Sequence, residues 1–241
     1  MSNAVAVARP PEGNSLSLER ELKYVVPAGR ALLVRSIVSA LCRPDTRYPS
    51  ATVFTIYYDT PDLALLSEKI NSDYLKTKVR LRWYSTAVPQ GATGTFLEIK
   101  SRVGSLRHKV RVEIPLALAM VRDQPLHHPA LLEVLELARP LGVPVPARLM
   151  PALLLRYERF RFVEPMSASR ISVDTDIEAV RGNPRLVGNA IPERLPLAVV
   201  EVKGTGDDLP RPLHQLIRLG ARRSSFSKYG AAGFAMLRYV H

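Results

Sequence analysis

The stretch YLKTKVRLRWYS, residues 74–85, alternates between cationic and apolar side chains. Successive side chains of a β-strand point to opposite faces, so this pattern predicts a strand with one cationic and one apolar face. The cationic face would carry Lys76, Lys78, Arg80 and Arg82, and the apolar face Leu75, Val79, Leu81 and Trp83.

The same alternation recurs along most of the chain. Charged residues take every second position in at least six predicted strands, and acidic residues share these faces with lysine and arginine. Further strands are predicted at 17–26, 52–61, 94–102, 106–115, 153–164, 169–180 and 195–206. Helices are predicted after Pro27, over 62–71, within about 116–146, over 207–220 and from Tyr229. Mainly antiparallel strands with a few helices indicate an α+β fold.

Length and composition are typical of one globular domain. The 241 residues are 46% apolar and 23% charged, and 34 basic against 22 acidic side chains give a net charge of +12. Residues 1–15 are predicted to be disordered and 16–241 to form a single domain. The single cysteine, Cys42, excludes an internal disulfide. Without a recognisable signal peptide or membrane helix, we expect a cytoplasmic protein that is not itself membrane-spanning.

Two arrangements of the charged faces fit the pattern. The faces either point into water, or line a closed barrel of about eight antiparallel strands with helices packed outside. Lysines and arginines that converge in a lumen are tolerable only together with anions and carboxylates. The second arrangement therefore predicts a site for a ligand with several negative charges in a line. Carboxylates on the same faces suit a divalent cation in such a site.

The motif ERELKY, residues 19–24, resembles the Glu-x-Glu-x-Lys signature of the CYTH/triphosphate tunnel metalloenzyme superfamily. The remaining chain resembles the VTC branch, which comprises the polyphosphate polymerase domain of the vacuolar transporter chaperone and its bacterial relatives. This likeness extends over residues 16–238 and implies a β-barrel tunnel that binds ATP and a growing polyphosphate with Mn²⁺ or Mg²⁺. It is carried by KVRLRWY (78–84), TFLEIKSR (95–102), RHKVRVEI (107–114), LLRYERFRF (154–162), RISVDTDI (170–177), VVEVKG (199–204) and SFSKYG (225–230).

The resemblance implies roles for residues at the matching positions. The cations expected to bind and position the reacting phosphates are Lys23, Arg80, Arg82, Lys100, Lys109, Arg159, Arg170 and Lys228. Further substrate contacts are expected from Tyr157, Ser227, Lys203 and Arg111, and metal ligation from Glu201, Glu19 and Glu21. Where relatives often have a basic residue before the FSKY motif, this chain has Ser225, with Arg222 and Arg223 nearby. The preferred polyphosphate chain length therefore stays open.

The leading functional hypothesis is metal-dependent transfer of the ATP γ-phosphoryl group to inorganic polyphosphate. Whether a separate membrane protein receives the product stays open. A tripolyphosphatase or nucleoside triphosphatase using the same tunnel is the main alternative, and a non-catalytic polyphosphate- or nucleotide-binding module is another. No nucleic-acid partner is expected, because basic groups alternate with carboxylates and no nucleic-acid motif is present. For Lys76 and Lys78, surface charge alone is an alternative, whereas Tyr57, Tyr58 and Trp83 are interpreted as core or barrel-wall residues.

Overall fold

The computed structural model describes residues 19–70, 75–85, 94–103, 106–114, 121–136, 146–187 and 192–237. The segment 1–15, for which the sequence predicts disorder, lies outside these ranges, as do residues 116–120 and 137–145 of the predicted helical stretch 116–146. Within the described ranges no helix is long and apolar enough to cross a membrane.

Eleven strands of the described chain form one sheet in which all pairings are antiparallel. Nine of them follow the order β11-β1-β10-β8-β7-β3-β4-β5-β6, while β2 pairs with β7 and β9 with β8. Their bounds are β1 Arg20–Pro27, β2 Arg43–Pro44, β3 Ser50–Asp59, β4 Leu75–Ser85, β5 Thr95–Val103, β6 Leu106–Ile114, β7 Met150–Val163, β8 Arg170–Gly182, β9 Glu193–Arg194, β10 Leu197–Gly204 and β11 Arg222–Arg223.

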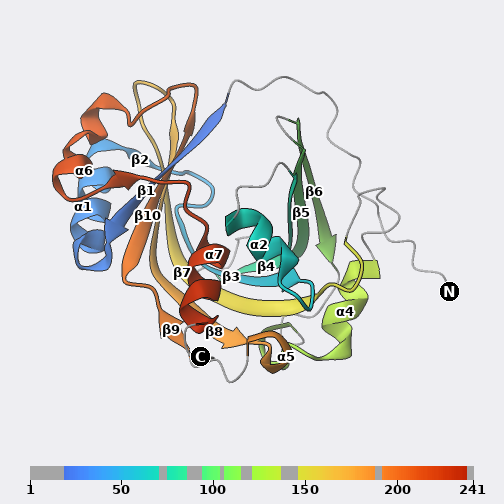
Figure 1. Ribbon diagram of the computed structural model, residues 1–241. Helices are drawn as coiled ribbons and strands as arrows, with labels where there is room; N and C mark the ends of the chain where they lie inside the picture. The colour runs from blue at the N-terminus through green and yellow to red at the C-terminus, as the bar shows by residue number, and fades with distance from the viewer. Residues whose placement is uncertain are drawn as a thin grey trace.

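The sheet curves strongly, so that the wall formed by β1 and β10 faces the wall formed by β5 and β6 (Figure 1). Among the described residues no strand pairing joins β6 to β11 or β1, and the sheet is not closed by hydrogen bonds. The predicted closed barrel is therefore not confirmed, although the antiparallel α+β fold is. Alternation determines which face of a strand is charged, but it does not determine whether two edge strands come within hydrogen-bonding distance.

Two apolar clusters cover the outer face of the sheet, as predicted for helices packed outside. On β1, β8 and β10, the cluster is completed by α1 (Ala31–Leu41), η3 (Arg211–Leu213) and α6 (Gln215–Arg218). The second cluster lies on β3, β4 and β5 and is completed by α4 (Pro129–Glu136) together with Val121 and Leu126. Trp83 and Tyr58 lie fully buried in this second cluster, which confirms their interpretation as core residues.

The helix predicted over 207–220 is wrong in length. Pro210 has an extended backbone with ψ 137°, and Gly220 takes φ +86°, in the left-handed region that favours glycine. Helical backbone is therefore restricted to the two short turns η3 and α6 between them. The predicted helix after Pro27 begins as η1 (Ala28–Arg30) and continues as α1.

A third apolar cluster lies on the inner face of the sheet, where the sequence predicts no helix. Here α2 (Ala64–Ile70) and α7 (Lys228–Leu237) pack through Leu66, Tyr229 and Met236 onto inward-facing residues such as Leu155 and Val199. A Cβ at Gly233 of α7 would lie 3.0 Å from Leu66 Cδ2, so glycine permits the close approach of these two helices. The expectation that helices lie only outside is thus corrected, because α2 and α7 fill part of the concave side. The short helix α5 (Pro184–Val187) lies close to α7.

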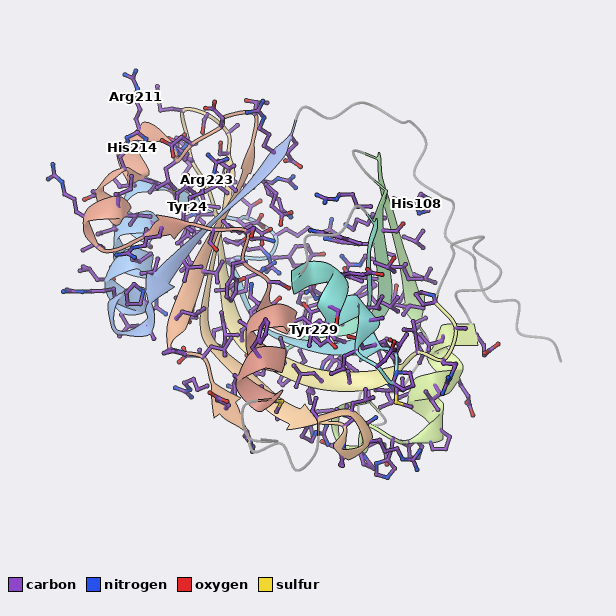
Figure 2. All side chains as sticks on the ribbon, viewed as in Figure 1. Tyr24, His108, Arg211, His214, Arg223 and Tyr229 are labelled. Atoms are coloured by element: carbon purple, nitrogen blue, oxygen red, sulfur yellow. The ribbon has the colours of Figure 1, made fainter. Side chains whose placement is uncertain are left out.

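A buried carboxylate anchors these inner helices. Asp59, at the end of β3, accepts hydrogen bonds from the backbone N–H groups of Leu65 and Leu66 at 2.8 and 2.9 Å. The hydroxyl of Tyr229 donates to Asp59 Oδ2 at 2.6 Å. Figure 2 shows Tyr229 on α7, next to α2. One carboxylate therefore satisfies the N-terminus of α2 and holds the first turn of α7.

Candidate functional site

The concave side of the sheet contains a cavity of about 910 Å³. Among the described residues, fourteen lysine and arginine side chains line it against three glutamates, Glu21, Glu98 and Glu201. His108 also lines it from the wall of β5 and β6, opposite the wall that carries Tyr24 and Arg223 (Figure 2). Such an excess of cations favours a ligand that carries several negative charges.

Strand alternation places the cations in this cavity. On β4 the lining side chains are Lys76, Lys78, Arg80, Arg82 and Tyr84, whereas the alternate residues Val79, Leu81 and Trp83 are buried under α4. On β5 the lining set is Phe96, Glu98, Lys100 and Arg102, and the alternate residues Leu97 and Ile99 join the outer cluster. The prediction that the charged faces point inward is confirmed. Lys76 and Lys78 are therefore cavity residues and not surface charge alone.

The structure brings together all but one of the residues singled out from the sequence. Those that line the cavity are Lys23, Arg80, Arg82, Lys100, Lys109, Arg111, Tyr157, Arg159, Arg170, Glu21, Glu201, Lys203, Ser227 and Lys228. Glu19 is the exception, since it is exposed just before β1 and pairs with Arg170 Nη2. The Glu19 carboxylate therefore pairs with an arginine at the edge of the cavity and does not join Glu21 and Glu201, which Lys203 links.

Asp174 lies beneath the cavity lining and holds two of its cations, Arg159 and Lys228, in place. This fully buried carboxylate on β8 accepts from Arg159 Nε and Nη2 at 2.6 and 2.7 Å, and Lys228 Nζ lies 2.6 Å away. Burial raises the pKa of Asp174, but the charges of Arg159 and Lys228 outweigh burial and hold it below its usual range. Both cations also lie over the ring of Tyr157, at 5.4 and 4.9 Å from its centroid. Asp174 thereby couples β7, β8 and the start of α7.

Glu98 plays the corresponding part between β4, β5 and β6. It is 3% exposed, and Arg80 Nε and Nη2 lie 2.7 and 2.6 Å from its Oε2. Arg82 and Arg111 approach the same carboxylate at 3.8 and 3.7 Å. Burial raises the pKa of Glu98, but the neighbouring arginines more than offset this effect and lower it to about 2. One carboxylate thus keeps three arginines close together at the wall.

Glu21 and Glu201 are linked by a shared lysine. Lys203 Nζ lies 3.0 Å from Glu201 Oε1 and 3.6 Å from Glu21 Oε2, while Lys23 Nζ lies 2.8 Å from Glu21. Burial raises the pKa of Glu201, but Arg159 and Lys203 lower it well below its usual range. In the described part of the chain, no group of three or more acidic, histidine or cysteine side chains forms a metal cage. Two carboxylates do suit a Mg²⁺-type ion that takes its other ligands from phosphates and water.

Two groups in the cavity have pKa values near neutrality. Burial and the charge of Arg80 lower the pKa of Lys100 to about 8. For Tyr57, burial raises the pKa, but Arg80, Arg82 and nearby lysines lower it to about 8. The charges of Glu21 and Lys203 on the opposite wall also act on the pKa of Lys100 on β5, so the two walls face one cavity. Tyr57 is 6% exposed and stacks on Tyr229, which confirms it as a wall residue.

Sequence reasoning missed several residues of this site. Arg161 continues the inward alternation of Tyr157 and Arg159 on β7, so alternation alone could have found it. No sequence signal distinguished Asp174 from other acids, because its role depends on contacts with β7 and α7. The aromatic lining residues Tyr84 and Phe96 were likewise missed.

Comparisons with known proteins give one family match. A family model described as VTC domain matches residues 18–237. No curated protein sequence matches the chain. Among solved structures, a candidate adenylate cyclase from Vibrio parahaemolyticus is 16% identical, with 87% of this chain and 94% of that chain covered and a TM-score of 0.45.

Two further solved structures are similar at the same level. A candidate adenylate cyclase from Bacillus halodurans is 13% identical, with 87% and 92% of the two chains covered and a TM-score of 0.46. The Mimivirus capping enzyme triphosphatase is 10% identical, with 83% and 88% covered and a TM-score of 0.39. These likenesses are too distant to support an argument about function.

Proposed function

The chain belongs to the VTC domain family, and on this premise we propose that its cavity binds ATP and inorganic polyphosphate and transfers the γ-phosphoryl group to the polyphosphate end. The observation that carries the proposal is the convergence of fourteen cationic side chains of the described residues on one cavity of about 910 Å³. Only a ligand with many closely spaced negative charges would neutralise this set.

The arrangement of the cations suits phosphoryl transfer. This reaction needs little covalent help from a protein, so positioning and neutralisation of the phosphate oxygens supply most of the catalysis. Arg80, Arg82 and Arg159 can each present a planar fork to a phosphate, whereas Lys23, Lys100 and similar lysines act as point charges. A guanidinium has five N–H donors, so an arginine held by one carboxylate, such as Arg80 on Glu98, keeps donors for a phosphate.

For a divalent cation, the residues that fit are Glu201 and Glu21. Their two carboxylates are joined by Lys203 and face the cations of the opposite wall, so a bound phosphate chain would complete the oxygen ligands. When bound, Mg²⁺ or Mn²⁺ would neutralise phosphate oxygens and increase the electrophilicity of the phosphorus. Arg159, 3.8 Å from Glu201 Oε2, would orient the same phosphate groups.

Product analysis tests the proposal. The purified chain is incubated with ATP, a short polyphosphate primer and Mn²⁺ or Mg²⁺, and the products are separated on a polyacrylamide gel. We expect the primer to lengthen while ADP accumulates. Release of orthophosphate without longer chains would instead support the tripolyphosphatase or nucleoside triphosphatase alternative. Phosphate binding without turnover would support a binding module.

A variant of Glu201 tests the metal assignment separately. Glu201→Gln keeps the size of the side chain but removes the charge, so we expect metal-dependent turnover to be lost while the fold is retained. The matched control is Glu133→Gln, the same change at an exposed position on α4. Wild-type turnover in the Glu201 variant, at the same metal concentration, would reject the assignment.

A further inference from the structure

We propose that Tyr84, Phe96 and Arg111 form a stacking subsite for the base of a nucleoside triphosphate at one end of the cavity. This assignment rests on the proposed function, since it presumes that phosphates occupy the cationic part. It adds a direction to the site: the nucleoside would lie at the aromatic end, and the triphosphate would point toward Arg82, Arg80 and the cations beyond them.

The two rings lie together at the end of the inner face of β4 and the beginning of that of β5. Tyr84 is the last inward-facing residue of β4, and Phe96 is paired directly opposite Arg82 in the β4–β5 register. The rings meet edge to face, with centroids 6.4 Å apart and planes at 63°. Both side chains are half-buried and line the cavity.

Planar cations accompany the rings. The guanidinium of Arg111 lies 3.9 Å from the ring centroid of Phe96 and 6.0 Å from that of Tyr84, and the guanidinium of Arg161 lies 5.7 Å from Tyr84. The Arg111 side chain is 39% exposed. A base can therefore stack either on an aromatic ring or on a guanidinium plane that covers such a ring. Proteins that bind unpaired bases use both arrangements.

At the opposite end of the described parts of β4 and β5, no aromatic side chain of these strands lines the cavity. The corresponding inward positions there are Lys76 and Lys78 on β4 and Lys100 and Arg102 on β5, all of them cationic. Tyr57 and Tyr157 also line the cavity, but they are only 6% and 1% exposed and are packed under α7, so their faces are covered. Phe96 and the Arg111 guanidinium that lies over it instead form a planar surface that lines the cavity, on which a flat ligand group can stack.

Strand geometry gives the subsite the right reach. At about 3.3 Å per residue, Tyr84 lies about 7 Å beyond Arg82 along β4, and Arg80 lies the same distance on the other side of Arg82. A base beside Tyr84 would thus place a ribose near Arg82 and the phosphates among Arg82, Arg80 and Arg159. Because every base has an aromatic face, this subsite should accept adenine and guanine almost equally.

Binding measurements with and without a nucleoside test the assignment. Isothermal titration in the presence of EDTA, which prevents metal-dependent turnover, compares ATP with inorganic tripolyphosphate for the wild type and for Phe96→Leu. We expect the variant to raise the Kd of ATP about 5- to 150-fold and to leave that of tripolyphosphate unchanged. Tyr84→Leu provides a second, independent truncation of the surface. Phe54→Leu is the matched control, because Phe54 stacks on Trp83 in the outer cluster, away from the cavity.

Each outcome discriminates. If Phe96→Leu and Tyr84→Leu weaken ATP and tripolyphosphate equally, or weaken neither, the stacking subsite is overturned while the phosphate site stands. Binding of tripolyphosphate but not ATP by the wild type would overturn both the subsite and ATP as the phosphoryl donor, while the phosphate site stands. Binding of neither ligand by the wild type would overturn the proposed function itself. A large preference for ATP over GTP would contradict a subsite made by stacking.

Discussion

Replacing Asp174 with asparagine removes the counter-ion of Arg159 and Lys228, two cations that line the cavity. Asparagine preserves the size of the side chain but leaves the charges of Arg159 and Lys228, both largely buried, without the carboxylate that lies 2.6–2.7 Å from them. Removing one partner of a buried ion pair costs about 3–5 kcal/mol. Because Glu201 remains 3.8 Å from Arg159, we expect a loss of about 3 kcal/mol in the free energy of unfolding. For a domain of this size, that loss lowers Tm by about 6–12 °C.

Urea unfolding followed by tryptophan fluorescence measures this loss, since Trp83 is the only tryptophan of the chain and is buried in the outer cluster. The matched control is Asp176→Asn, the same substitution two residues along β8. Asp176 is 53% exposed and its partner Arg194 is 64% exposed, so its loss should cost less than about 1 kcal/mol. An Asp174→Asn variant within about 1 kcal/mol of the wild type, or an equal loss in both variants, would refute the reasoning.

Three further predictions concern Glu98, Lys100 and Tyr229. As pH falls from about 4.5 to about 2, the free energy of unfolding should decline. Burial raises the pKa of Glu98, but its arginine neighbours more than offset this and lower it from 4.5 to about 2. The ionised carboxylate therefore stabilises the fold fully above the pKa of the unfolded state, and this contribution is lost as pH falls through the pKa of the folded state. Urea titrations across this range should show a shallower decline for Glu98→Gln, and identical slopes would contradict the assignment. Tripolyphosphate affinity, measured by calorimetry, should weaken as pH rises through about 8, where Lys100, whose pKa is lowered by burial and by Arg80, loses its proton. Lys100→Arg should show a smaller dependence, which comes from Tyr57, whose pKa is also about 8. A variant with the full wild-type dependence would count against the assignment to Lys100. Tyr229→Phe should lower the stability in thermal unfolding by about 1–3 kcal/mol, because it removes the donor 2.6 Å from the buried Asp59, and an unchanged Tm would show that the contact contributes nothing.

Local alternation predicted the strands and their faces well. The stretch predicted as a strand over 74–85 is β4, Leu75–Ser85, and every inward position assigned from the pattern lines the cavity. The reason is that side chains of a strand alternate strictly, so a cationic and an apolar set must separate onto two faces. The apolar set of Val79, Leu81 and Trp83 then requires cover, which α4 supplies. The fifteen candidate site residues came from the family resemblance, and fourteen of them line one cavity, Glu19 excepted.

Tertiary structure decided three features that no local pattern contains. Whether the sheet closes depends on the accumulated curvature of many strands, and the described strands end at β6 and β11 without pairing. Whether a helix covers the outer or the inner face depends on which face has room, because an apolar stripe such as that of α7 can pack on either. The role of Asp174 depends on Arg159 and Lys228, which are 15 and 54 residues away in the sequence. A strand's own residues therefore determine the charge of its face, whereas the site exists because distant strands bring those faces within reach of one ligand.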